Sequence, residues 1–172
     1  MDLSFIIVNW NTCQLLVNCI ESIRKTVSGY CYEIIVVDNG SEDGSVPAIQ
    51  RHFGKQVILI KNRQNLGFAR ANNQALRIAQ GRFIVLLNSD AVLKPSAIDV
   101  LITFLAMTPS AAMAGPRMVN STGTLQNSYD NFPSLVTELL NKSLLRFFFP
   151  GKYAGKSSCA TSPFEVDSLI GA

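Results

Sequence analysis

The polar side chains best suited to binding a ligand or a metal each follow a short apolar segment. They are Asn9, Asp38 and the triplet Asn88-Ser89-Asp90. A carboxylate only accepts hydrogen bonds, so Asp38 could take the N3–H of uracil or thymine. Asp90 suits a divalent cation held jointly with a diphosphate, and Asn88 could add an amide oxygen. Asx residues at strand ends also make turns and helix caps, which is the plain structural alternative.

These side chains can meet only if the apolar runs are neighbouring strands. The runs are short, unalternating and separated by helical patterns, which predicts βαβ units and a parallel sheet with helices on both faces. Ligands of such sheets bind beyond the carboxyl ends of the strands. The expected strands are 3–8, 34–37, 57–60, 83–87 and a short fifth at 111–114. The expected helices are one capped by 11–12 with Leu15 facing inward, one ending near 53, and those at 67–80 and 95–107.

The alternation of strand and helix patterns stops after Pro116. A turn signal at 121–123 predicts a small hairpin within 118–128. An amphipathic helix is expected at 134–149, a polar loop at 151–162 and a strand at 164–170.

Composition narrows the class of protein. The chain has 172 residues, which favours one domain. Apolar residues make up 48% and charged residues 16%, so a packed core is expected. The net charge of +3, with scattered basic residues, argues against a nucleic-acid binder.

Cysteine usage and hydropathy indicate a cytoplasmic protein. Cys13, Cys19, Cys31 and Cys159 form no C-x-x-C pair, so we expect buried or half-buried free thiols. No basic signal-peptide region opens the sequence, and no uncharged run reaches the ~20 residues of a membrane span.

Several common sites are disfavoured by absent motifs. The sequence has neither G-x-G-x-x-G after its first strand nor a G-x-x-x-x-G-K-[ST] loop, which argues against a dinucleotide site and a P-loop. His52, the only histidine, is expected to be structural or at the surface.

At this point the motifs resemble a known family. The sequence looks like the family 2 glycosyltransferases with a GT-A fold, and in particular their rhamnosyltransferase-like branch, which builds bacterial surface polysaccharides. The likeness rests on IVNWN at 7–11, VVDNGS at 36–41, NLGFARANN at 65–73, LLNSD at 86–90, GPR at 115–117, FPS at 132–134 and VDSLIGA at 166–172.

The resemblance implies roles for single residues. Asp38 would hold the nucleotide base, and Asn9 and Asn39 would belong to the same donor site. Residues 88–90 would be the D-x-D motif, with Asp90 the main ligand of Mn²⁺ or Mg²⁺, assisted by Asn88, and with Ser89 in the donor site. Arg70 and Asn73 share one helix face and could approach the diphosphate or sugar.

Two departures from the family pattern stand out. Asn88 replaces the first acid of the motif, so metal affinity without nucleotide should be weak. Members of this type invert the anomeric centre with a carboxylate base well after the Gly-Ala segment, whereas this sequence ends at Ala172. We therefore expect one domain in which 1–117 is the nucleotide-binding half, 118–172 is an incomplete acceptor half, and the base is missing. Asp167 is expected to be structural or to line the substrate.

The implied reaction moves a sugar from a UDP- or dTDP-linked donor to a saccharide or lipid-linked saccharide. One alternative is a non-catalytic nucleotide-binding or assembly module. The aromatic run 147–149 lies beside basic residues and could touch a partner or the inner face of the membrane. The other alternative, a sugar-1-phosphate nucleotidyltransferase, would need a glycine-rich loop where 9–12 stand.

Overall fold

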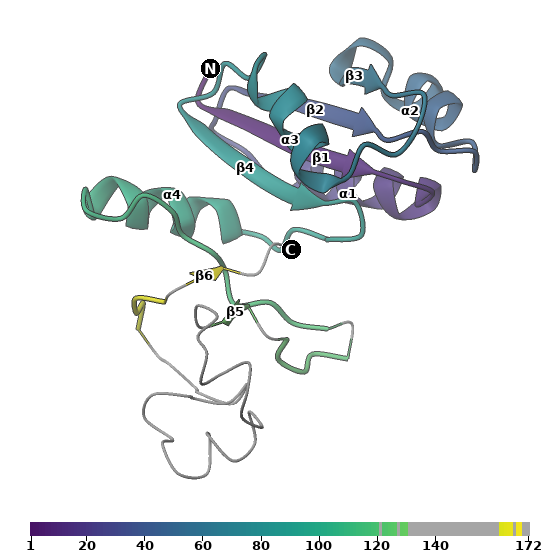
Figure 1. Cartoon of the computed structure of the whole chain (residues 1–172). Helices are drawn as coiled ribbons and strands as arrows, with labels where there is room; N and C mark the ends of the chain where they lie inside the picture. Colours follow the sequence, from purple (N-terminus) through teal and green to yellow (C-terminus); the bar gives the residue numbers. More distant parts are fainter. Residues whose placement is uncertain (121, 127, 131–161, 167, 170–172) are drawn as a thin grey trace, which may run out of the picture. The chain divides into compact units, whose positions relative to one another are not determined.

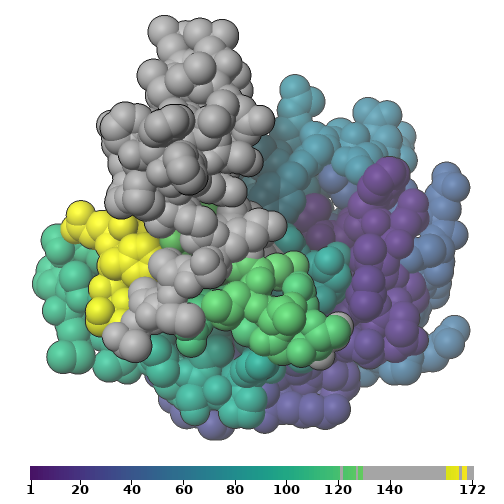
Figure 2. All heavy atoms as spheres, turned by 90° about the horizontal axis from the view of Figure 1, so that it is seen from below, coloured from purple at the N-terminus to yellow at the C-terminus, as the bar shows by residue number. Residues whose placement is uncertain are grey.

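The computed structural model describes residues 1–120, 122–126, 128–130, 162–166 and 168–169; the other residues are grey in Figures 1 and 2. The chain divides into two compact units, Met1–Ser110 and Ala111–Gly171. The helix expected at 134–149 and most of the loop expected at 151–162 lie outside the described residues.

The first unit is built on a parallel sheet. Its strands are β1 (Leu3–Asn9), β2 (Tyr32–Asp38), β3 (Ile58–Lys61) and β4 (Phe83–Asn88), in the order β3-β2-β1-β4. Figure 1 shows the four arrows running in one direction. In this register Asn9 lies opposite Asp38, and Val8 lies opposite Asn88. The predicted parallel sheet is confirmed, and the polar strand ends fall on one edge.

Helices cover both faces of this sheet, as predicted. The helices α1 (Cys13–Thr26), α2 (Ser45–Phe53) and α4 (Ala97–Met107) contribute buried side chains to a core with the strand residues Phe5, Ile7 and Val36. On the other face, α3 (Phe68–Leu76) packs through Ala71 and Ala75 against Ile6, Ile35 and Val37 (Figure 1). A short 3₁₀ turn, η1 (Gly54–Gln56), links α2 to the chain before β3.

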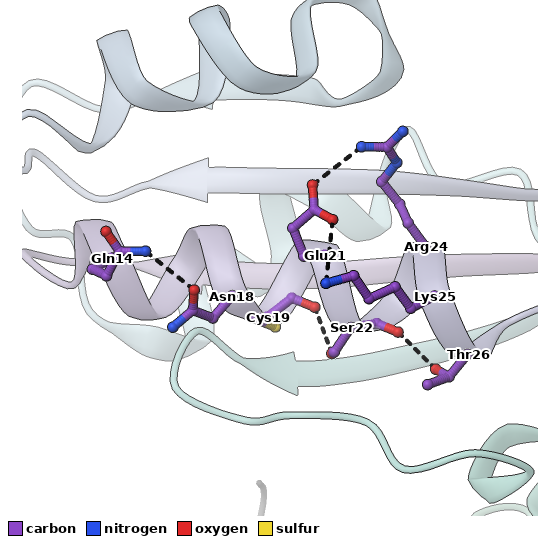
Figure 3. Close-up of polar contacts among 8 residues, drawn as sticks. All are labelled: Gln14, Asn18, Cys19, Glu21, Ser22, Arg24, Lys25 and Thr26. Carbon is purple, nitrogen blue, oxygen red and sulfur yellow. Dashed lines mark hydrogen bonds and ion pairs between the residues drawn. The ribbon is translucent and has the colours of Figure 1, made fainter.

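The helix α1 shows how local pattern sets burial. Leu16, Cys19, Ile20 and Ile23 recur at helical spacing and are fully buried. The opposite face is polar and carries contacts one turn apart, such as the ion pair of Glu21 with Arg24 at 3.2 Å (Figure 3). The expectation that Leu15 faces inward is wrong: it lies beside the apolar stripe and is 47% exposed.

Two predicted helices are shorter in the structure. The helix expected at 67–80 ends at Leu76, and the helix expected at 95–107 begins at Ala97 rather than at Pro95. The predicted strand at 111–114 is wrong, because these residues form no strand. Three of the four are alanine, which has low β-propensity, and Pro109 and Pro116 flank them.

In the second unit the predicted hairpin is confirmed by an antiparallel bridge between Val119 and Leu125. Its turn is closed by hydrogen bonds between Asn120 and Thr124 and between Gly123 and Asn120, each 2.8 Å. Strand β5 (Tyr129–Asp130) pairs antiparallel with β6 (Ser168–Leu169), which is shorter than the strand expected at 164–170.

Within the described ranges, no helix combines the length and the apolar character needed to cross a lipid bilayer.

Candidate functional site

Asp38 lies at the centre of the polar edge. It ends β2 and is only 3% exposed. Its Oδ1 accepts from Asn9 Nδ2 at 2.9 Å, and its Oδ2 accepts from the backbone N–H of Ser41 at 3.0 Å. These two hydrogen bonds hold the carboxylate in place. Each of its oxygens can still accept a further hydrogen bond, so the carboxylate can also bind a ligand.

Ser41 joins the loops that follow β1 and β2. Its Oγ accepts from Asn9 Nδ2 at 3.0 Å and from the backbone N–H of Asn11 at 2.9 Å. Asn11 has a left-handed backbone, with φ of 54°, and its Oδ1 accepts from the backbone N–H of Glu42 at 2.8 Å. The hydroxyl hydrogen of Ser41 has no acceptor among the described residues, so Ser41 can donate to a ligand beside Asp38.

The first helix turn is capped by an unexpected residue. Thr12 stands at the N-cap of α1 but makes no capping hydrogen bond. Instead Asp43 Oδ2 accepts from the backbone N–H of Cys13 at 2.7 Å. Burial acts to raise the pKa of Asp43, but hydrogen bonds from Ser45 and Cys13 outweigh it and hold that pKa below its usual value. Thr12 therefore occupies the predicted N-cap position, but its side chain makes no capping bond because its hydroxyl contacts Asn9 and Ser89.

Asn39 belongs to an amide network behind Asp38. It is 2% exposed, and its Nδ2 donates to Asn65 Oδ1 at 2.8 Å. Its Oδ1 accepts from Asn62 Nδ2 at 3.1 Å and from the backbone N–H of Leu66 at 3.0 Å. These bonds fix the loop between β3 and α3 to the end of β2.

In the triplet at the end of β4, two residues contact the protein and the third is an acid without a partner among the described residues. The backbone carbonyl of Asn88 accepts from the N–H of Ala91 at 3.1 Å, which closes a turn. Ser89 is buried, and its Oγ lies 2.7 Å from Thr12 Oγ1. Asp90 is exposed and has no hydrogen bond or ion pair among the described residues.

The nearby Cys19 thiol stays protonated at neutral pH. Burial, assisted by the charge of Asp90, raises the pKa of this thiol to about 12.

The donor set at Asp90 determines what cation it could hold. Among the described residues, no group of three His, Cys, Asp or Glu side chains is placed to hold a metal ion. One carboxylate and the Asn88 amide fit a hard cation whose remaining ligands are diphosphate oxygens and water. The residues therefore fit a cation that arrives with a nucleotide, and they do not form a closed metal cage.

Arg70 and Asn73 lie on α3, as predicted, and both are exposed. Neither side chain makes a hydrogen bond or ion pair in the part of the chain that the structure describes, so both remain available to a ligand. Trp10, which follows Asn9 and is 56% exposed, was not among the predicted site residues. The signal in the sequence was a large aromatic residue directly after the polar residue that ends the first apolar run.

The structure also tests the other reactive side chains. His52 is exposed on α2 and contacts the Phe53 ring, so the predicted surface placement is confirmed. Cys19 is buried and Cys13 half-buried, as predicted, and both are free thiols. Cys31 is exposed, contrary to the prediction, because it precedes β2 outside the core. Cys159 lies outside the described residues.

Comparison with known proteins identifies the family of this chain. Residues 4–167 match the family model described as glycosyl transferase family 2. Chondroitin synthase of Escherichia coli is 26% identical over 150 residues, which cover 85% of this chain and 22% of that protein. A second E. coli protein is 38% identical over 79 residues, which cover 42% of this chain and 32% of that protein. It is named UDP-Glc:alpha-D-GlcNAc-diphosphoundecaprenol beta-1,3-glucosyltransferase WfaP.

A solved structure agrees with the family match. The mannosyltransferase PcManGT from Pyrobaculum calidifontis, in complex with GDP-Man and Mn²⁺, superposes with a TM-score of 0.55 at 27% identity. The match covers 60% of this chain and 32% of that one. The chain thus spans a third or less of the length of these three proteins. The predicted family and fold are confirmed, and the rhamnosyltransferase-like branch stays a prediction. The family model covers nearly all of the sequence, so this chain belongs to glycosyl transferase family 2 and has the GT-A fold.

Proposed function

We propose that this domain binds a pyrimidine nucleoside-diphosphate sugar with a divalent cation and transfers the sugar, with inversion, to a saccharide or lipid-linked saccharide. The observation that carries the proposal is the presence of two acids at one edge of the sheet, at the ends of the strands on either side of β1. Asp38 is buried and fixed by its neighbours, while Asp90 is exposed and unpaired among the described residues.

The base would bind at Asp38. Uracil and thymine present an N3–H donor flanked by two carbonyl acceptors. Asp38 would accept from N3–H, and the uncommitted hydroxyl hydrogen of Ser41 would donate to a flanking carbonyl. The exposed Trp10 indole offers a face on which the base can stack.

Guanine is the competing base, because a carboxylate can accept from its adjacent N1–H and N2–H₂ donors together. The mannosyltransferase structure was solved with GDP-Man, so this alternative belongs in any test. The Ser41 donor fits either base, because guanine O6 lies beside N1–H just as a carbonyl lies beside N3–H of uracil, so the comparison of UDP with GDP decides between them.

The diphosphate would lie toward Asp90. Asp90 and Asn88 would hold Mn²⁺ or Mg²⁺, and the cation when bound supplies positive charge that stabilises the departing diphosphate. The Arg70 guanidinium is an exposed cation suited to phosphate oxygens, and Asn73 can donate to phosphate or sugar.

The transfer itself is an in-line displacement. An acceptor hydroxyl oxygen forms a new bond to the anomeric carbon as the bond from that carbon to the diphosphate oxygen breaks. The hydroxyl proton passes to a carboxylate base, to which we assign no residue. A lipid-linked acceptor, of the kind named for WfaP, would place this reaction at the cytoplasmic face of a membrane.

A thermal-shift screen tests the donor. We expect UDP or dTDP with Mn²⁺ to stabilise the chain by about 2.7 kcal/mol when the ligand is present at about 100 times Kd. Asp38→Ala should abolish the response to UDP with Mn²⁺, and Asp90→Ala should lower it by about 1.4 kcal/mol or more. No stabilisation of the wild type by UDP, dTDP or GDP, with or without metal, would contradict the proposal.

A further inference from the structure

Thr12 lies between the two ends of the proposed donor site. Its Oγ1 is 2.7 Å from Asn9 Oδ1, and the same oxygen is 2.7 Å from Ser89 Oγ. Asn9 in turn contacts Asp38. A continuous line of hydrogen bonds therefore joins the carboxylate at the end of β2 to the triplet at the end of β4.

The chemistry of the carboxylate fixes the direction of every bond in this line. A carboxylate only accepts, so the Asn9 amide must turn its Nδ2 toward Asp38 and its Oδ1 toward Thr12. Thr12 then has to donate its hydrogen to Asn9 Oδ1. With that hydrogen committed, Thr12 Oγ1 can only accept from Ser89. The order of donation is Ser89 to Thr12, Thr12 to Asn9, and Asn9 to Asp38.

The direction has a consequence for Ser89. Its hydroxyl hydrogen is committed to Thr12, so toward a ligand it can present only lone pairs. Ser89 can accept from a ribose or sugar hydroxyl, or face a cation, but it cannot donate to a phosphate oxygen. The expectation that Ser89 belongs to the donor site is thereby narrowed to an acceptor role.

We infer that Thr12 is a positioning residue that couples the base end of the site to its diphosphate end. This inference rests on the proposed function. The loop after β1 lies between the loops after β2 and β4, and Thr12 is its contact with the β4 loop through side chains. Hydrogen bonds in a line polarise one another, so a change at Asp38 alters the acceptor strength of Thr12 toward Ser89.

The plain alternative is that Thr12 serves only as a helix cap. The structure disfavours it, because Thr12 makes no capping bond and the backbone N–H of Cys13 is already bonded to Asp43. Removing the hydroxyl should therefore act on the line of hydrogen bonds and leave the start of α1 intact.

Calorimetry with three proteins tests the coupling: wild type, Thr12→Val, which keeps the shape but loses the hydroxyl, and Thr12→Ser, which keeps the hydroxyl. For Thr12→Val we expect the Kd of UDP with Mn²⁺ to rise about tenfold while that of uridine changes less than about twofold. Thr12→Ser should bring UDP binding back to within about twofold of wild type. A merely structural residue would weaken uridine and UDP in parallel, and that result would overturn the coupling.

Should Thr12→Val fold poorly, Thr12→Ala removes the same hydroxyl and should give the same split between UDP and uridine. A ligand-free measurement separates this inference from the proposed function. In a ¹H–¹⁵N spectrum, Ser89→Ala should shift the Asn9 side-chain amide in the Thr12 background but not in the Thr12→Val background. Equal shifts in both backgrounds would overturn the line of hydrogen bonds, whereas the wild type's failure to bind any nucleotide would overturn only the proposed function.

Discussion

The residues proposed to bind the base and those proposed to bind the diphosphate differ in how the protein holds them; they are called here the base end and the diphosphate end. At the base end, Asp38 and Asn39 are almost fully buried and their side chains already have protein partners. At the diphosphate end, Asp90, Arg70 and Asn73 are exposed and make no hydrogen bond or ion pair among the described residues. Under the proposed function, the residues assigned to the base are fixed before binding, whereas those assigned to the diphosphate would gain their partners from the cation and the ligand.

The largest expected effect follows from changing the preorganised end. Asp38→Asn places an amide where both contacts require an acceptor, so a donor would face either Asn9 Nδ2 or the Ser41 N–H. We expect UDP affinity to fall more than about 100-fold and stability to fall by about 1–3 kcal/mol. Calorimetry and chemical denaturation measure the two effects.

Glu42→Gln is the matched control for Asp38→Asn, because it removes a negative charge from the same loop at an exposed residue whose carboxylate makes no hydrogen bond in the described structure. It should bind UDP like the wild type. Equal losses in both variants would mean that loop charge, and not the placed carboxylate, determines binding.

The amide network behind Asp38 should affect stability more than binding chemistry. Asn39→Ala leaves the Asn62 amide and the backbone N–H of Leu66 without their shared acceptor. We expect a loss of about 1–3 kcal/mol in the free energy of unfolding, measured with urea. Asn73→Ala, at an exposed position, should stay within about 0.5 kcal/mol of the wild type. A comparable loss in both would remove the distinction between the two ends.

At the diphosphate end, a substitution should weaken nucleotide binding and leave stability almost unchanged. Asp90→Asn should weaken UDP with Mn²⁺ about tenfold, which corresponds to about 1.4 kcal/mol, while the free energy of unfolding stays within about 0.5 kcal/mol of the wild type. Uridine, which carries no phosphate, should bind both proteins equally. A marked loss of stability in Asp90→Asn would show that this acid is structural.

The smallest expected effect concerns Asp43 and pH. Its pKa is lowered in the folded chain, so its stabilising contribution is complete above the ordinary value of 3.8 and is lost as the pH falls through the lowered value. Asp43→Asn should melt within a few degrees of the wild type at pH 7, and its stability should decline less between pH 5 and about 2. Parallel decline of the two proteins would contradict the assigned capping role.

The sequence allowed prediction of the sheet, its parallel direction and the meeting of Asn9, Asp38 and Asn88 at one edge, because apolar runs and strand ends are local features. It did not reveal which side chain bonds to which. Thr12 stands at the expected N-cap position of α1, yet the side chain that accepts the capping hydrogen bond is Asp43, thirty residues from the Cys13 N–H that donates it. The partners of Asn39 are likewise 23 to 27 residues away in the chain, so only the packed loops bring them together.

The most direct test is the metal dependence of two ligands that share a base. We predict that uridine binds the wild-type chain with the same Kd in Mn²⁺ and in EDTA, and that Mn²⁺ tightens UDP binding about tenfold or more. This result would place the base in a preorganised pocket and the cation at the diphosphate. Mn²⁺-dependent binding of uridine, or UDP binding indifferent to Mn²⁺, would contradict the division of the site into these two ends.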